Sequence, residues 1–508
     1  MKPGITDLMK VHTIIAARRL NFASVERWSK KTFRRFRPLK TRSPALVSAR
    51  DHYASEGIPE VLRVPDGIPA ESRLSYPYLV PYYIVTGLLF KLYRRWPIRR
   101  GIPWSPDFAF NRAFPKTREG WKDVFDDREF GRMRLQGPNP FLLERRDDGS
   151  YELDYSPYFK DIFEPVVCEF ELRGKDLMPT TIRVGERRFR PGEEGWDRAK
   201  IIANGLDARY CVFNLHLLET HLLIGQSFAL SAFSLPKDHP LRSFLHLFTY
   251  GTLVVNDFAY KLLITPASYF IQSGFISGPD ALTLFRNSMD AFSLDDLMVP
   301  IDVAKRGIDQ IPDHPYVADA LDTWAVFEKF STGVVEKIYG DDAAVVADNA
   351  LQSWYHALAS LLPNQDVTDQ PLVSRRQLVD LFCCLLYNNV VHEVCGDFSL
   401  FGETESPEHK KMINFERLKQ GDFEAPAEMA DVFLFHQGAY AGRFNVGGNN
   451  MMSLKLKGMT DDEELQRAVE VLQQELRDLD AELEERNRGR EFKLLRMMPR
   501  KWELSISF

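Results

Sequence analysis

The stretch His216–Ile264 reads HLLETHLLIGQSFALSAFSLPKDHPLRSFLHLFTYGTLVVNDFAYKLLI and places two histidines, His216 and His221, five residues apart in an apolar run. Histidine is the commonest protein ligand for transition metals. Five residues of a regular α-helix turn the side chain through about 140°, whereas a π-helical turn brings an i,i+5 pair onto one face. The two histidines could therefore bind one metal ion if the helix contains a π-turn. Because the motif is weak alone, two buried structural histidines remain the alternative.

The composition sets the broad class of the protein. A chain of 508 residues can hold one large domain with an appendage, or two to three ordinary domains. Hydrophobic residues make up 44% and aromatic residues 12%, so a sizeable core is expected. The net charge of −6 argues against a nucleic-acid binder. Five cysteines, an odd number without CxxC spacing, argue against a disulfide framework or a zinc ribbon.

The sequence around the histidine pair resembles that of a known enzyme family. Upstream stands WDRAKIIANGLDARYCVFNLHLLETH (Trp196–His221), and downstream stand His239-Pro240 and NDFA (Asn256–Ala259). These stretches resemble the ligand helix and the following substrate helix of lipoxygenases, the non-haem iron dioxygenases of polyunsaturated fatty acids. The resemblance continues over most of the chain, in Asp127–Arg146, Leu294–Pro312, Thr323–Tyr339 and the closing residues Leu504–Phe508.

The fold expected from the resemblance is mainly α. It comprises a large lipoxygenase-type helical catalytic domain over residues 106–508, with a few short β-strands and the metal on a long central helix. The residue pattern agrees, because the apolar runs Ala325–Ile338 and Ser374–Val391 exceed the length of a strand. Tyr151–Phe159 and Thr180–Pro191 are rich in β-branched and aromatic residues and predict short strands or a hairpin.

A leucine repeat near the end of the chain allows two interpretations. Thr460–Glu463 has the form of a capping box, and Gly489 is a plausible helix end. Apolar residues between them alternate at spacings of four and three, at Leu465, Val469, Leu472, Leu476, Leu479 and Leu483. Such a repeat could form a coiled-coil dimer, but it is under four heptads long. We therefore expect a surface helix that packs on its own domain, and a monomer.

The resemblance implies a ligand set for one non-haem iron, with manganese as the alternative. The ligands carried over are His216, His221, His392 and the C-terminal carboxylate of Phe508. The family often adds an Asn four residues after the third histidine, but this chain has Gly396 there. Water could fill that position, or Cys395 or Asp397 could approach it, and a thiolate would favour zinc or change the redox potential.

The implied reaction inserts O2 into a polyunsaturated fatty acid or related apolar lipid. A metal-bound hydroxide abstracts a hydrogen atom, and a lipid hydroperoxide forms. Three positions fall where the family lines its substrate channel, Ala259, Leu263 and Phe270, although apolar residues at helical spacing are usually core. Departures at Gly396, Ser399 and Val212 keep open a hydroperoxide isomerase or oxidation of another apolar substrate. A non-catalytic lipid-binding protein is the third hypothesis.

Residues 1–105 form a distinct basic and aromatic arm. The first fifty residues hold thirteen Lys and Arg against only Asp7 and Glu26, and Tyr76–Arg100 is an apolar run that ends in a basic cluster. It is too short to span a bilayer, but it could lie at a membrane surface or form a lid. An arginine-rich start is also typical of organelle transit peptides. We expect a cytoplasmic or peripherally membrane-associated protein, with organelle targeting left open.

Overall fold

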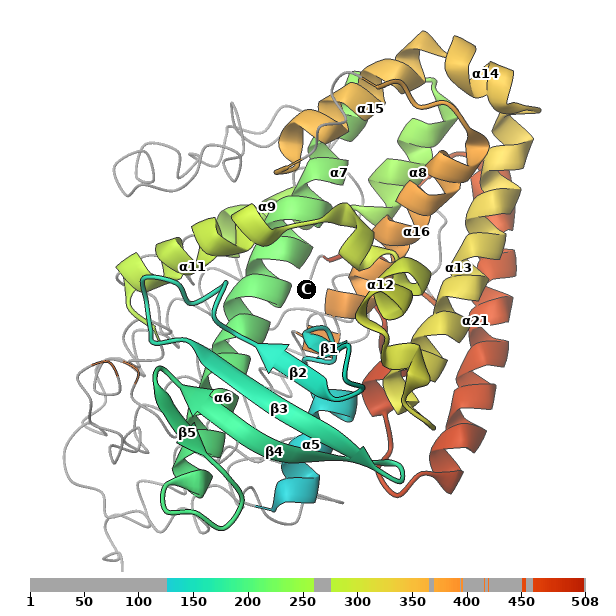
Figure 1. Cartoon of the computed structure of the whole chain (residues 1–508). Coiled ribbons are helices and arrows are strands. Elements are labelled where there is room, and N and C mark those ends of the chain that lie inside the picture. The colour runs from blue at the N-terminus through green and yellow to red at the C-terminus, as the bar shows by residue number, and fades with distance from the viewer. Residues whose placement is uncertain are drawn as a thin grey trace, which may run out of the picture.

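A body of helices with one small β-sheet at one end makes up the structure (Figure 1). It is a computed structural model, and it describes residues 126–259, 276–364, 370–392, 394–395, 415, 419, 450–453 and 460–506. The predicted fold class, mainly α with a few short strands, is confirmed. The predicted arm, residues 1–105, lies outside the described residues.

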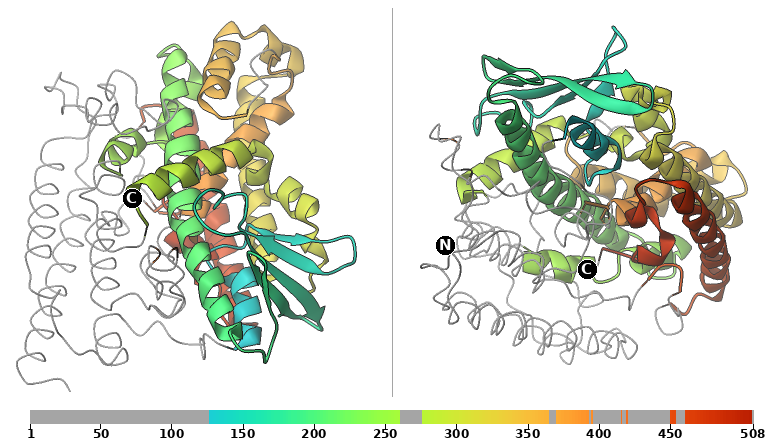
Figure 2. Two further views of the ribbon diagram at one scale, coloured as in Figure 1. Left: turned by 60° about the vertical axis from the view of Figure 1, so that its left-hand side comes forward. Right: turned by 90° about the horizontal axis from the view of Figure 1, so that it is seen from below.

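The body is built around one continuous helical column of three segments. These are α6 (Trp196–Arg209), η4 (Tyr210–Gly225) and α7 (Gln226–Ser231), which run on without a break in Figure 2. The chain keeps right-handed helical dihedral angles at Arg209 and Gln226, where the segments join. Helices α9, α11 and α16 pack against η4, so the middle of the column is enclosed.

Other helices surround this column. The longer ones are α5 (Asp127–Gln136), α8 (Pro240–Phe248), α9 (Thr252–Ala259), α11 (Gly278–Ala291), α12 (Val299–Arg306), α13 (Pro315–Ile338), α14 (Asp342–Ala347), α15 (Asn349–Leu361), α16 (Arg375–His392) and α21 (Glu463–Gly489). Short 3-10 turns are η5 (Ala232–Ser234), η7 (Leu294–Leu297), η8 (Ile308–Gln310), η11 (Leu495–Met497) and η12 (Pro499–Lys501). The helices predicted from the two long apolar runs correspond to α13 and α16.

The sheet is an antiparallel meander in the order β1-β2-β3-β4-β5. Its strands are β1 (Leu143–Arg145), β2 (Tyr151–Asp154), β3 (Val166–Arg173), β4 (Asp176–Val184) and β5 (Arg187–Phe189). Both predicted strand regions are confirmed, the second as the β4–β5 hairpin around Gly185. Sequence reasoning missed β3, the strand that joins the two regions into one sheet.

Helix α5 packs closely on strand β4 because one of its residues has no side chain. A Cβ added to Gly131 would overlap the backbone carbonyl oxygen of Leu177. A backbone atom in a sheet cannot move aside as the end of a side chain can. Gly131 therefore sets the distance between α5 and the sheet.

A buried ion pair anchors the start of the column to α5. Arg134 Nη1 lies 2.8 Å from Asp207 Oδ2 on α6, and both side chains are almost fully buried. The hydroxyl of Tyr155 donates to Asp207 Oδ1 at 2.8 Å, and the amide of Asn139 donates to the same oxygen at 2.7 Å. A buried carboxylate with this many partners is costly to disturb. The network therefore fixes α6 just before η4 begins.

Helix α21 packs along α13 at the edge of the body, as Figures 1 and 2 both show. The six residues of the leucine repeat are all buried. The prediction that this helix packs on its own domain is confirmed. The predicted cap was wrong in one respect: the N-cap is Asp462, whose carboxylate accepts from the backbone N–H groups of Glu464 and Leu465. Thr460 instead accepts from the backbone N–H of Asp462.

None of the helices among the described residues is both long and apolar enough to cross a membrane.

We predict that Gly131→Ala lowers the free energy of unfolding by roughly 1–3 kcal/mol, because the new methyl group forces α5 away from β4. Gly333→Ala is the matched control. Gly333 also lies inside a helix, α13, but no atom lies within 4 Å of an added Cβ. It should be neutral or stabilise by about 0.5–1 kcal/mol. Urea denaturation of both variants tests this, and equal midpoints would contradict it.

Candidate metal centre

The two predicted ligands meet because the helix that carries them is π-helical. Segment η4 is a π-helix of 16 residues, much longer than the single widened turn that the spacing predicted. His221 Nε2 lies 3.2 Å from His216 Nε2, and both rings are buried. The predicted convergence of the i,i+5 pair is therefore confirmed. On an α-helix the two rings would point about 140° apart.

Two further i,i+5 contacts follow the same winding. The amide of Asn214 donates to Glu219 Oε1 at 2.7 Å, and the hydroxyl of Thr220 donates to the carbonyl oxygen of Leu215 at 2.7 Å. Each contact joins a residue to the one that lies below it in a π-helix but not in an α-helix. Polar side chains within the segment thus stabilise the winding that brings the histidines together.

Burial keeps both imidazoles neutral. It lowers the pKa of His221 to about 4, although the hydrogen bond to Asn256 acts to raise that pKa. It also lowers the pKa of His216 well below its ordinary value. A neutral imidazole offers the lone pair that a metal needs. Two nitrogens bound at about 2.1 Å to a single ion would lie about as far apart as these do. The two described residues therefore fit a transition-metal ion.

His221 has a partner on its other side. Its Nδ1 lies 3.0 Å from Oδ1 of Asn256, on α9. The amide nitrogen of Asn256 donates to the backbone carbonyl of His221 at 2.7 Å and to Gln226 Oε1 at 3.2 Å. Sequence reasoning quoted Asn256 within a motif but gave it no role. A buried asparagine in an apolar helix was the available signal.

The third predicted ligand, His392, is the last residue of α16, and α16 packs against η4. Its side chain lies outside the described part of the structure. One turn earlier, the amide of Asn388 donates to the carbonyl oxygen of Thr220 at 3.1 Å, next to His221. Asn388 Oδ1 is buried without a hydrogen-bond partner among the described residues. Helix α16 therefore brings polar groups to the ligand segment at the predicted place.

The remaining predicted site residues stay predictions. Phe508, Gly396, Leu263 and Phe270 lie outside the described residues, and so does the side chain of Ala259, the last residue of α9. Within the described ranges no three His, Cys, Asp or Glu side chains converge as a metal site. The structure thus brings two of the four predicted ligands together.

The segment that precedes Phe508 lies against the end of the ligand helix. Ile506 is buried, and a Cβ added to Gly225 would overlap its Cδ1 atom. The amide of Asn389 donates to the carbonyl oxygen of Leu504 at 2.8 Å. The hydroxyl of Ser505 donates to the backbone carbonyl oxygen of Tyr250 at 2.7 Å. These contacts hold residues 504–506 beside η4, where the predicted fourth ligand would have to arrive.

Cys395, which the sequence offered as a substitute ligand, has another neighbour. Its thiol lies 3.6 Å from the carbonyl oxygen of Pro138, and burial raises its pKa well above the ordinary value. A thiol that stays protonated is a poor metal ligand. His239 has a structural role instead: it caps α8, and its Nε2 lies 3.0 Å from Asp348 Oδ2.

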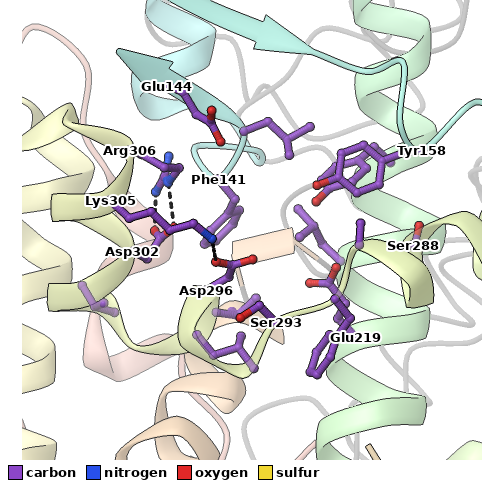
Figure 3. A pocket seen from close by; sticks show the side chains of 18 of the residues that line it. Phe141, Glu144, Tyr158, Glu219, Ser288, Ser293, Asp296, Asp302, Lys305 and Arg306 are labelled. Carbon is purple, nitrogen blue, oxygen red and sulfur yellow. Dashed lines mark hydrogen bonds and ion pairs between the residues drawn. The ribbon is translucent and has the colours of Figure 1, made fainter. Parts of the chain in front are cut away.

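A small cavity with a mixed polar and apolar lining lies beside the ligand helix (Figure 3). Its volume is about 90 Å³, and its wall includes Glu219 and Tyr158 on one side and the Asp296–Lys305 ion pair on the other. Burial raises the pKa of Glu219 to about 7. Ligand pockets for drug-sized molecules measure roughly 300–1,000 Å³, so this cavity holds a few waters and not a fatty acid.

Comparison with known proteins identifies the family. The family model described as Lipoxygenase matches residues 165–392, the region that runs from the sheet to the predicted third ligand. Over these residues the chain is a member of the lipoxygenase family. The match ends at His392, so both described histidines and the third predicted one fall inside it.

The curated relatives of this chain are named for more than one reaction. The linoleate 9/13-lipoxygenase of Pseudomonas aeruginosa is 25% identical over 54% of this chain and 48% of its own length. The hydroperoxide isomerase ALOXE3 of Homo sapiens is 31% identical over 33% of this chain and 24% of its own. The chain thus spans less than half the length of these relatives. A coral 8R-lipoxygenase structure shares the fold, with a TM-score of 0.70 at 20% identity over 93% of this chain and 83% of its own.

We predict that Gly225→Ala displaces the closing segment and lowers thermal stability, because the new methyl group overlaps Ile506 Cδ1. The double variant Gly225→Ala, Ile506→Val removes that methyl group and should recover part of the loss. A double-mutant cycle of melting temperatures measures the coupling. Additive effects would show that Gly225 and Ile506 are not in contact, and would contradict the prediction.

Proposed function

We propose that this chain is a lipoxygenase-type dioxygenase that inserts O2 into a polyunsaturated fatty acid. The main support for this proposal is the pair of buried, neutral imidazoles whose Nε2 atoms lie 3.2 Å apart on a π-helix. Buried polar groups normally have partners, and two neutral imidazoles that face each other through Nε2 are placed to share one metal ion. The relatives named linoleate 9/13-lipoxygenase and the coral 8R-lipoxygenase support the reaction class.

The ion in this proposal is one non-haem iron. His216, His221, His392 and the terminal carboxylate of Phe508 would hold it, the last two on the strength of the family resemblance. Bound iron supplies the one-electron chemistry that takes a hydrogen atom from a doubly allylic CH2 and lets O2 add to the delocalised lipid radical. Manganese could occupy the same ligands.

The chain's own residues keep the site dry and rigid. Every residue of η4 except Glu219 is buried, so the imidazoles work in a medium that excludes bulk water. Helix α9 contacts His221 through the side chain of Asn256. The last residue of α9 is Ala259, the position predicted to line the substrate channel. An apolar channel along α9 would bring the lipid chain next to the two imidazoles.

A second candidate function uses the same fold and metal. A hydroperoxide isomerase rearranges a lipid hydroperoxide without net addition of O2. The relative of that name and the absence of an Asn ligand at Gly396 favour this reading. A lipid-binding protein without catalytic activity is the third candidate function.

We predict that the purified chain contains near-stoichiometric iron and produces a conjugated-diene absorbance with linoleic or arachidonic acid. His216→Ala and His221→Ala should each lose most of the iron and all of the diene signal, because the shell loses a ligand. His239→Ala, which removes a helix cap on α8, is the control and should keep the iron. Mass spectrometry gives the metal content.

Each alternative has its own outcome in this experiment. Iron without diene growth, together with consumption of an added fatty-acid hydroperoxide, would establish the isomerase. Little iron in the parent, with both histidine variants behaving like it, would leave a lipid-binding protein. Full iron in both histidine variants would refute the ligand assignment itself.

A further inference from the structure

Asn256 contacts His221 at two points, its ring and its backbone. The side chain of Asn256 is fully buried, and it reaches from α9 to the ligand helix. Its Oδ1 faces His221 Nδ1 at 3.0 Å, and its Nδ2 donates to the carbonyl oxygen of His221 at 2.7 Å. Nδ2 also donates to Gln226 Oε1 at 3.2 Å. All polar atoms of this amide therefore have partners.

These contacts allow only one orientation of the Asn256 amide. A backbone carbonyl oxygen can only accept a hydrogen bond, so the atom that faces the His221 carbonyl must be the NH2 group. A flipped amide would put two oxygens against each other in a buried site, which is costly. Oδ1 is therefore the atom that faces the ring of His221.

The orientation of the amide determines the tautomer of His221. Oδ1 can only accept, so a neutral His221 must carry its proton on Nδ1. Nε2 then carries no proton, and it is the atom that faces His216. A metal-binding histidine commonly donates its other ring N–H to a partner of this kind, which fixes ring and tautomer.

We infer that Asn256 is a positioning residue that holds His221 as the Nδ1–H tautomer with Nε2 turned towards the metal position. The inference rests on the proposed metal centre for its purpose, but the tautomer follows from the hydrogen bonds alone. Asn256 acts through His221 and needs no contact with the metal or the substrate.

A second buried asparagine separates this role from general support of the helix. Asn388 also donates to a backbone carbonyl of η4, that of Thr220, at 3.1 Å. It is as fully buried as Asn256. Among the described residues its hydrogen bond runs to the backbone and not to an imidazole. Asn388→Leu therefore removes a comparable brace next to His221 and leaves the ring contact in place.

The first test needs no metal. The full chain, labelled with ¹⁵N-histidine and dialysed against a chelator, gives ring-nitrogen shifts that distinguish the two tautomers. The His221 signal is assigned by its loss in His221→Ala. We expect Nδ1–H in the parent and in Asn388→Leu, and a mixture of tautomers in Asn256→Leu, which keeps the shape but offers no acceptor. An Nε2–H tautomer in the parent would overturn the inference.

The second test measures iron binding. Competition with a chelator should show that Asn256→Leu binds Fe²⁺ about 10–100-fold more weakly than the parent. Asn256→Asp keeps an acceptor for Nδ1–H but loses the donor to the His221 carbonyl, so it should recover only part of this loss and should shift the ferric electron paramagnetic resonance signal. Asn388→Leu should bind as the parent does. Parent-like affinity in Asn256→Leu, or an equal loss in Asn388→Leu, would refute the positioning role.

The two tests separate this inference from the proposed function. If the parent binds no iron but shows His221 as the Nδ1–H tautomer, the metal centre fails and the assignment of the hydrogen bonds stands. If the parent binds iron and converts fatty acids while Asn256→Leu keeps the same tautomer, the role of Asn256 fails and the proposed function stands.

Discussion

Hydrogen bonding to the fifth residue, not the fourth, is the constraint on which the site depends. It makes η4 a π-helix over 16 residues, and without it His216 and His221 would point in different directions. A π-helix is rarely stable by itself. Here the contacts Asn214–Glu219 and Thr220–Leu215 repeat the i,i+5 spacing within the segment. The winding is thus supported from inside as well as by the helices around it.

The rest of the fold holds this unusual segment at both ends. At its start, the ion pair between Arg134 and Asp207 fixes α6 against α5, and Gly131 lets α5 settle on the sheet. At its end, Gly225 leaves room for Ile506. A small side chain is needed there because the closing segment passes directly over the helix. The glycines thus mark close approaches at which helix and neighbour must touch.

The sequence predicted those parts of the site that depend on local spacing. The i,i+5 interval of His216 and His221 indicated that they could share an ion only on a π-turn, and long apolar runs were enough to predict α13 and α16. The length of the π-helix was not predictable, because it depends on partners far along the chain. Helices α11 and α16, for example, pack on η4 from far along the chain.

The role of Asn256 was hidden for the same reason. It lies 35 residues from His221, and its amide has meaning only once α9 is packed on η4. Strand β3 and the Asp462 cap were missed for local reasons. In the run VVCEFELR apolar and polar residues alternate imperfectly. Two polar residues close together, Thr460 and Asp462, could each have capped α21.

The departure at Gly396 gives the contact between Asn256 and His221 more weight. If this chain lacks the side-chain amide that lipoxygenases often place near the metal, fewer protein ligands define the shell, and each imidazole must hold its orientation without that help. Asn256 meets this need for His221, and it does so from α9, the helix that ends at Ala259. A shift of α9 would therefore reach the imidazole through a single amide. If the lipid channel runs along α9 as proposed, Asn256 links its wall to the metal position, and substitutions along α9 would alter both together.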